Sequence, residues 1–190
     1  MRFGNVPAPT APENQRTRPA LLVDAGPLIT LAYANALDLL LRPGWPLRMV
    51  DMVLHELTRR DTPARERIQN FVEGNGIPVM PTQTWQMYQL RVQRAAGSGL
   101  PPPRKANLGE MAIQESIMAL ALQDPPQPVV LLFEDRRIAR AGFMLPEGTL
   151  RTSTRSFLRM LEQRGFIPSA AEVERCAVEA GRAFSPLEYP

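Results

Sequence analysis

The chain has 190 residues, of which 44% are hydrophobic, so it is long enough for one domain with a buried core. Its formal net charge is +3, and its single cysteine, Cys176, excludes an internal disulfide. No apolar run approaches the roughly 20 residues that span a bilayer and no secretory signal is recognisable, so we expect a cytoplasmic protein without membrane contact.

The basic side chains are almost all arginine, because Lys105 is the only lysine. Guanidinium groups bind phosphate oxygens in a bidentate way, which favours a polyanionic partner. A GC-rich genome produces the same bias, so this composition alone does not identify the partner.

The chain divides into an arm, a domain and a terminal segment. Residues 1–18 are rich in proline and poor in large apolar groups, which predicts a flexible arm. One α/β domain is expected over residues 19–168, and a C-terminal helix with a tail over residues 169–190.

Short apolar runs alternate with helical patterns along the domain. Strands are predicted over residues 20–23, 47–53, 77–80 and 129–133, with a last short strand near Leu150. Helices are predicted over residues 28–41, 64–73, 85–95, 107–123, 136–141, 153–164 and 170–183, and one more carries Glu56. This order predicts a three-layer α/β/α fold whose central parallel sheet has about four to five strands.

Acidic residues follow the predicted strands. Asp24 comes directly after the first strand, and Glu134 and Asp135 follow the fourth. Glu56 lies about one helical turn beyond the second strand, and Glu110 lies in the first turn of the long helix. The carboxyl ends of parallel strands meet at one edge of a sheet, so these carboxylates are expected to converge there. Hard oxygen ligands in such a group favour Mg²⁺ or Mn²⁺.

Each acid also has a purely structural interpretation. Asp24 could be the N-cap of the following helix, and Asn107 with Glu110 has the spacing of a capping box. Glu56 could be an exposed helical residue, and residues 134–135 could form a solvated turn. The functional interpretation therefore depends on all of them meeting at the same edge of the sheet.

Taken together and in order, the acidic segments resemble the motifs of the PIN-domain family. The matching segments are Val23–Ile29, Val53–Leu57, Asn107–Ala112 and Leu131–Arg137. The stretch from Glu134 to Pro168 is similar to the VapC-like toxin ribonucleases whose fourth motif is of the Asp-Asp-Arg-Arg type. The chain departs from that motif at Phe133, where Thr or Ser is common, and at Glu134, where the family has Asp.

The resemblance implies a PIN-like fold and a metal-dependent endoribonuclease, often the toxin of a toxin–antitoxin pair. The implied catalytic residues are Asp24, Glu56, Glu110 and Asp135, with Asp24, Glu110 and Asp135 as ligands of Mg²⁺ or Mn²⁺ and Glu134 as an auxiliary acid. The implied partners are RNA and a cognate antitoxin protein, and a homodimer is a further option.

Acidic ligands repel RNA, so cations are expected around them. The candidates for phosphate contact are Arg136, Arg137, Arg140 and Arg155. The alternative for each is a solvated helix face with surface ion pairs.

Several apolar and aromatic residues keep two interpretations. Trp85 and Tyr88, three residues apart on one helix, could stack nucleobases or pack the core, and His55 could lie at the surface or in a packed position. Leu37 and Leu40 could form a docking face or be buried. On the long helix, the core-facing residues are expected to be Met111, Met118 and Leu122.

Two other function classes compete with the nuclease. A non-catalytic descendant of the same fold would bind RNA or protein without metal. A Rossmann-type nucleotide-binding domain shares the alternation of strands and helices, but residues 24–27 do not supply its glycine-rich turn.

Overall fold

The computed structural model of the chain describes residues 18–59, 61–103, 106–139 and 143–190. The arm predicted over residues 1–18 lies outside this part except for Arg18, and Arg140 also lies outside it.

A single sheet of five parallel strands forms the centre of the molecule. Its strands are β1 (Ala20–Val23), β2 (Leu47–Val50), β3 (Val79–Met80), β4 (Val129–Phe133) and β5 (Thr149–Ser153). The α/β class and the parallel sheet predicted from the sequence are therefore confirmed. Every residue of β1 and of β4 is buried, as their uninterrupted apolar sequences predict for strands covered on both faces.

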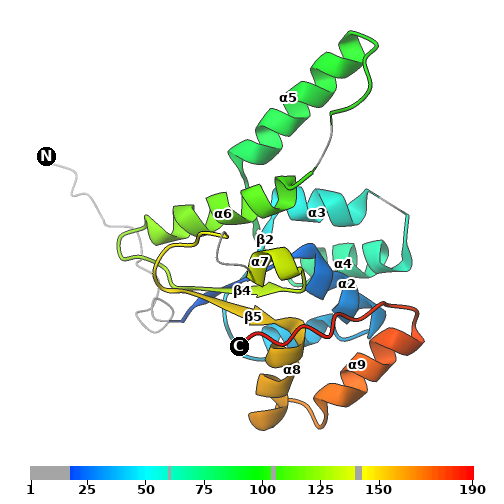
Figure 1. Cartoon of the computed structure of the whole chain (residues 1–190), viewed down its shortest axis with the longest axis vertical. Coiled ribbons are helices and arrows are strands. Elements are labelled where there is room, and N and C mark those ends of the chain that lie inside the picture. The colour runs from blue at the N-terminus through cyan, green and yellow to red at the C-terminus, as the bar shows by residue number, and fades with distance from the viewer. Residues whose placement is uncertain (1–17, 60, 104–105, 140–142) are drawn as a thin grey trace, which may run out of the picture.

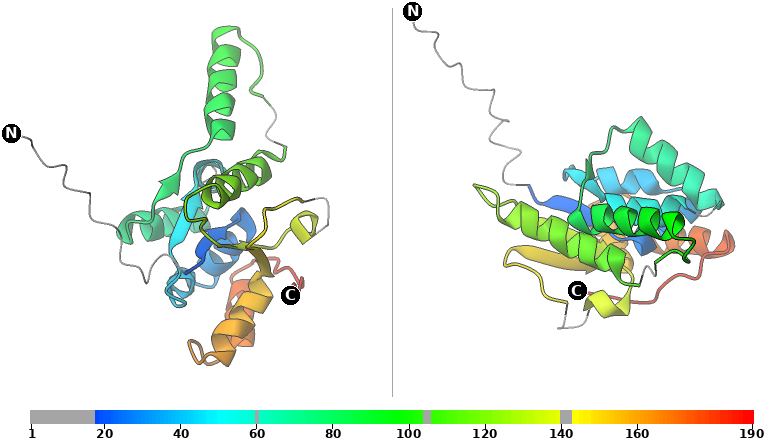
Figure 2. Two further views of the ribbon diagram at one scale, coloured as in Figure 1. Left: turned by 90° about the vertical axis from the view of Figure 1, so that its left-hand side faces the viewer. Right: turned by 90° about the horizontal axis from the view of Figure 1, so that it is seen from above.

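Helices cover both faces of the sheet. They are α2 (Ala25–Tyr33), the 3₁₀ helix η1 (Leu37–Leu41), α3 (Asp51–Thr58), α4 (Pro63–Gly74), α5 (Gln83–Gly97), α6 (Leu108–Ala121), α7 (Arg136–Ala139), α8 (Thr154–Gln163) and α9 (Ala170–Glu179). Helices α5 and α6 lie on one side of the sheet, and α8 and α9 lie on the other (Figures 1 and 2). Helix α5 projects away from the body of the molecule in the same views.

The strand order is β3-β2-β1-β4-β5. From β1 the chain continues to β2 and β3 on one side, and from β4 it continues to β5 on the other side. The connections that follow β1 and β4 therefore diverge, and a crevice opens beyond the carboxyl ends of these two strands. The register fixes the crevice, because Val23 pairs with Leu132 and the Asp24 amide donates to the Leu132 carbonyl at 2.9 Å. The residues that follow β1 and β4 therefore face one another.

Several element boundaries differ from the predictions, and two of the differences have a clear structural cause. The helix predicted over residues 28–41 is interrupted after Tyr33, because Asn35 adopts a left-handed backbone conformation with φ of 53°. The second strand ends at Val50 rather than residue 53, and the Asp51 carboxylate accepts hydrogen bonds from the Met52 amide at 2.6 Å and the Thr82 amide at 2.7 Å. Apolar residues continue past this point because α3 buries them as well.

The prediction for the core face of α6 was wrong. Met111, Met118 and Leu122 are exposed, while the buried face consists of Gly109, Ala112, Ile113, Ser116, Ile117 and Leu120. Apolar residues occur on both faces of this helix, so periodicity alone does not distinguish them. Leu37 and Leu40 are buried, which removes them as a docking face.

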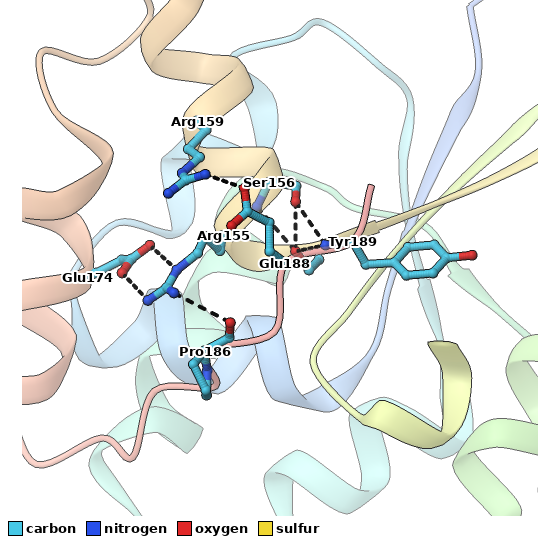
Figure 3. Close-up of polar contacts among 8 residues, drawn as sticks. Arg155, Ser156, Arg159, Glu174, Pro186, Glu188 and Tyr189 are labelled. Carbon is cyan, nitrogen blue, oxygen red and sulfur yellow. Dashed lines mark hydrogen bonds and ion pairs between the residues drawn. The ribbon is translucent and has the colours of Figure 1, made fainter. Parts of the chain in front are cut away.

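The C-terminal segment packs back onto the domain. Helix α9 contacts α2 and α8, and the tail after it returns to the end of β5, where the Ser153 amide donates to the Tyr189 carbonyl at 2.8 Å. Figure 3 shows the ion pairs that hold this segment, Arg155 with Glu174 and Arg159 with Glu188. Within the described ranges, no helix combines the length and the apolar character needed to cross a membrane.

Candidate functional site

A cleft of about 550 Å³ lies at the crevice between β1 and β4. Five carboxylates line it, those of Asp24, Glu56, Glu110, Glu134 and Asp135. They come from four parts of the fold: the end of β1, helix α3, the first turn of α6, and the end of β4. The predicted convergence of the acids on one cleft is therefore observed.

Asp24 is the acid with the most perturbed environment. Burial, together with the smaller effects of the negative charges of Glu56, Asp135 and Glu110, raises the pKa of Asp24 from 3.8 to about 6. A hydrogen bond from the Ala25 backbone opposes this shift. Glu56, Glu110 and Asp135 therefore lie close enough to act electrostatically on Asp24.

The capping interpretations of Asp24 and Glu110 do not hold. Asp24 occupies the N-cap position of α2, but its side chain makes no capping hydrogen bond. Asn107 has a φ of 63° and does not cap α6; instead its Oδ1 accepts a hydrogen bond from Arg137 Nη1 at 3.4 Å. Because α6 has no capping box, capping does not explain the position of Glu110, which lines the cleft.

Two glycines allow the close approach of two acids. A Cβ atom on Gly109 would lie 3.0 Å from Glu56 Oε2, so α6 passes directly against the Glu56 carboxylate. A Cβ atom on Gly26 would lie 2.9 Å from the Glu134 Cβ atom, so the start of α2 passes directly against Glu134. Small residues at these positions let three helices and β4 meet around the cleft.

Alanine substitutions at the two glycines are expected to have different effects. In Gly26→Ala the new methyl group meets the base of a buried side chain, so we expect a loss of about 1–3 kcal/mol of unfolding free energy. In Gly109→Ala it meets the end of the flexible Glu56 side chain, which can move, and alanine favours the helix by up to about 1 kcal/mol. Thermal denaturation of both variants measures the difference. Gly74→Ala, where nothing lies within 4 Å, is the control, and equal losses at positions 26 and 109 would contradict this account.

Glu134 has a structural role within the described contacts. Its Oε1 accepts a hydrogen bond from Thr154 at 2.8 Å, and its Oε2 pairs with Arg182 Nη2 at 3.1 Å. Only 7% of the Glu134 side chain is exposed. Because both oxygens already have partners, the predicted auxiliary acid is held as an anchor for α8 and the C-terminal tail.

Arg182 is a residue of the site that the sequence did not indicate. Its Nε donates to Thr30 at 3.0 Å and its Nη2 reaches the Gly26 carbonyl at 3.4 Å, in addition to the pair with Glu134. Ser185 on the same tail donates to the Glu134 carbonyl at 3.3 Å. The tail thus forms one wall of the cleft, from a position 48 residues beyond Glu134 for which no motif or spacing gives a signal.

The predicted RNA-binding arginines divide into different groups. Arg137 lines the cleft, and its amide donates to Asp135 Oδ1 at 2.8 Å, while Arg136 is exposed beside it. Arg155 forms two hydrogen bonds with Glu174, at 3.0 and 2.7 Å, and does not line the cleft. Its guanidinium therefore holds α8 to α9 outside the cleft. Arg140 is not among the described residues.

The acidic side chains of the cleft match a divalent cation in their chemistry. Asp24, Glu56, Glu110 and Asp135 offer only oxygen atoms, the ligand type that Mg²⁺ and Mn²⁺ prefer. The raised pKa of Asp24 comes mainly from burial and in smaller part from the neighbouring negative charges, which a cation would neutralise. Over the described ranges, however, no group of three or more His, Cys, Asp or Glu side chains has an arrangement that could hold a metal ion. The chemistry of the residues fits, and a shared ion requires their side chains to move closer together.

Comparisons with known proteins add little. No family model and no curated protein matches the chain. Among solved structures, it is similar to VapBC2 from Rickettsia felis, crystallised with a DNA fragment from the promoter, with 9% identity over 70% of this chain and 98% of that one. The TM-score is 0.37, so this likeness carries no argument about function.

Proposed function

We propose that this chain is a divalent-metal-dependent ribonuclease that hydrolyses phosphodiester bonds in the cleft between β1 and β4. The observation that carries the proposal is the position of Asp24, at the topological switch point of the sheet, with Glu56, Glu110 and Asp135 acting on its charge. The ordered resemblance of these four acids to the motifs of PIN domains supports the reaction type and the nature of the substrate.

The residues that line the cleft would have different roles in the reaction. Asp24, Glu110 and Asp135 would hold Mg²⁺ or Mn²⁺, and Glu56 would orient water beside them. A metal ion bound there supplies Lewis-acid activation of water and neutralises charge on the phosphate. Arg137, on the cleft wall, would contact a phosphate next to the reacting one, and Asp135 fixes the backbone of this arginine through its amide. Attack by water leaves a 5′-phosphate and a 3′-hydroxyl.

Cleavage of a mixed RNA pool tests the proposal. Wild-type protein is expected to cleave with Mn²⁺ and to be inactive in EDTA. Asp24→Asn and Asp135→Asn are expected to lose the metal-dependent cleavage while keeping the wild-type circular dichroism spectrum. Asp61→Asn is the control, because its side chain is fully exposed and lies outside the cleft. Cleavage that persists at full rate in EDTA would refute the metal-dependent mechanism.

A catalytically inactive binding module is the second candidate. It is favoured by the finding that no three acidic side chains of the described residues form a group that could hold a metal ion. It predicts RNA or protein binding that is the same with Mn²⁺ and with EDTA, and no cleavage. Calorimetric titration of Mn²⁺ separates the two candidates, since the nuclease requires a site that Asp24→Asn weakens.

The resemblance to PIN domains also suggests a cellular role for the proposed nuclease. A nuclease of this type would act in the cytoplasm as the toxin of a toxin–antitoxin pair, with a cognate antitoxin protein and a homodimer as its assemblies. Co-expression with the product of a neighbouring gene tests this extension, because an antitoxin would relieve growth arrest caused by the wild type.

A further inference from the structure

A second cavity, of about 460 Å³, lies between α3, the start of α5 and the segment that follows α5. Three aromatic rings line it: His55, Trp85 and Tyr88. The centroids of His55 and Trp85 are 4.4 Å apart, and those of Trp85 and Tyr88 are 5.8 Å apart with an angle of 24° between the ring planes. Tyr88 is buried, whereas His55 and Trp85 are only partly buried. The aromatic cluster therefore packs α5 onto α3 and still presents ring surface to an open space.

A third hollow lies between this aromatic cavity and the acidic cleft along α3. A groove of about 450 Å³ shares Ala25 and Glu56 with the cleft and shares Arg59 with the aromatic cavity. Arg59 is the C-cap residue of α3, three residues after Glu56 and four after His55, so it stands about one turn beyond both. The acidic cleft, the groove and the aromatic cavity therefore follow one another along α3 and its C-terminal end.

The polar groups of the aromatic cavity suit one kind of occupant. Gln89 and Gln93 lie four residues apart on α5, are exposed, and line the cavity. Their amides both donate and accept hydrogen bonds, as the edge of a nucleobase requires, while Trp85 offers a flat surface for stacking. Arg59, which is exposed at the entrance, carries the charge that a phosphate needs.

We propose that this cavity is a base-binding subsite, in which a nucleotide of single-stranded RNA outside the cleaved bond stacks on Trp85. The inference rests on the proposed ribonuclease function and specifies its substrate: an unpaired strand that runs from the acidic cleft across Arg59. Base stacking on an aromatic side chain is tolerant of sequence, so Gln89 and Gln93 supply the base preference.

Binding in EDTA tests the subsite without cleavage. Trp45 and Trp85 are the only tryptophans, so Trp45→Phe leaves Trp85 as the sole indole reporter. Eight-nucleotide oligouridylate and oligoadenylate are expected to quench the Trp85 emission as they saturate the protein. Labelled oligonucleotide anisotropy is expected to show about a tenfold loss of affinity in Trp85→Ala and little loss in Trp85→Phe. Leu90→Ala, at an exposed position of the same helix outside this cavity, is the control.

Several results would overturn the subsite. They are unchanged Trp85 emission at saturation, wild-type affinity in Trp85→Ala, absence of RNA binding in EDTA, and tighter binding of the matching oligodeoxynucleotide than of RNA. If Trp85→Ala does not fold, the exposed pair Gln89→Ala and Gln93→Ala replaces it, and unchanged affinity in that double variant rejects the proposal. Mn²⁺-dependent cleavage is measured in parallel: cleavage without Trp85 quenching rejects the subsite alone, and binding without cleavage rejects the nuclease alone.

Discussion

Asp24→Asn is expected to raise the unfolding free energy of the metal-free protein at neutral pH. The folded-state pKa of Asp24 is about 6 and its ordinary value is 3.8, because burial and neighbouring carboxylates disfavour its charge. A carboxyl group with a raised folded pKa contributes stability below the unfolded value and loses that contribution as the pH rises through the folded value. Above pH 6 the loss is at most ~3 kcal/mol. Asparagine removes the charge and keeps an oxygen for the Ala25 amide.

Denaturation in EDTA at two pH values measures this effect. At pH 7.5 the variant is expected to be more stable than the wild type, and near pH 4, where Asp24 is protonated in the folded chain, the advantage should disappear. Asp61→Asn should show no such pH dependence, because its side chain is fully exposed. A variant that is less stable than the wild type at pH 7.5 would show that the Asp24 charge is not destabilising.

Arg182→Met is expected to destabilise the protein by about 3 kcal/mol, because it leaves the buried Glu134 carboxylate without its cation. The C-terminal tail should also detach from the cleft, since Arg182 binds Thr30 and the Gly26 carbonyl as well. Urea denaturation gives the loss in stability, and limited proteolysis of the tail reports its release.

A double variant separates the charge from the packing. Adding Glu134→Gln to Arg182→Met removes the uncompensated charge, so the double variant should recover part of the lost stability. Arg159→Ala is the control: its ion pair with Glu188 is about half exposed on both sides and should contribute less than about 1 kcal/mol. If Arg182→Met matches Arg159→Ala, the Glu134–Arg182 pair does not hold the tail.

The sequence predicted the centre of the fold better than its connections. Strands β1 and β4 lie where the apolar runs place them, because a strand covered on both faces needs an uninterrupted apolar sequence. The break at Asn35 could not be predicted from periodicity, since it depends on one backbone conformation in an otherwise helical composition. The faces of α6 were confused because Met111 and Ile113 are equally apolar, and only the packed structure determines which is buried.

The candidate site was predictable to the extent that it depends on topology. Asp24 and Asp135 follow parallel strands, so they come close once β1 and β4 are neighbours in the sheet, as the structure has them. Arg182 was not predictable, because it reaches the cleft through the packing of α9. The ion pair of Arg155 with Glu174 was not predictable for the same reason, because Glu174 belongs to α9. Local sequence identifies groups at strand ends, but it does not identify partners supplied by distant helices.

The contact of the C-terminal tail with Ser153 also affects whether the sheet can pair with a strand of another molecule. Strand β5 lies at one edge of the sheet, and β3 lies at the other. An extended segment of another molecule can pair with the free backbone groups of such an edge strand. The Ser153 amide donates a hydrogen bond to the Tyr189 carbonyl. The Tyr189 ring packs against Phe133, and the Arg151 guanidinium lies over the Tyr189 ring, 5.2 Å from its centroid. The tail thus occupies one end of the outer edge of β5. The nine-residue stretch from Arg182 to Pro190, which shapes the cleft, also hinders another molecule from adding a strand at this end.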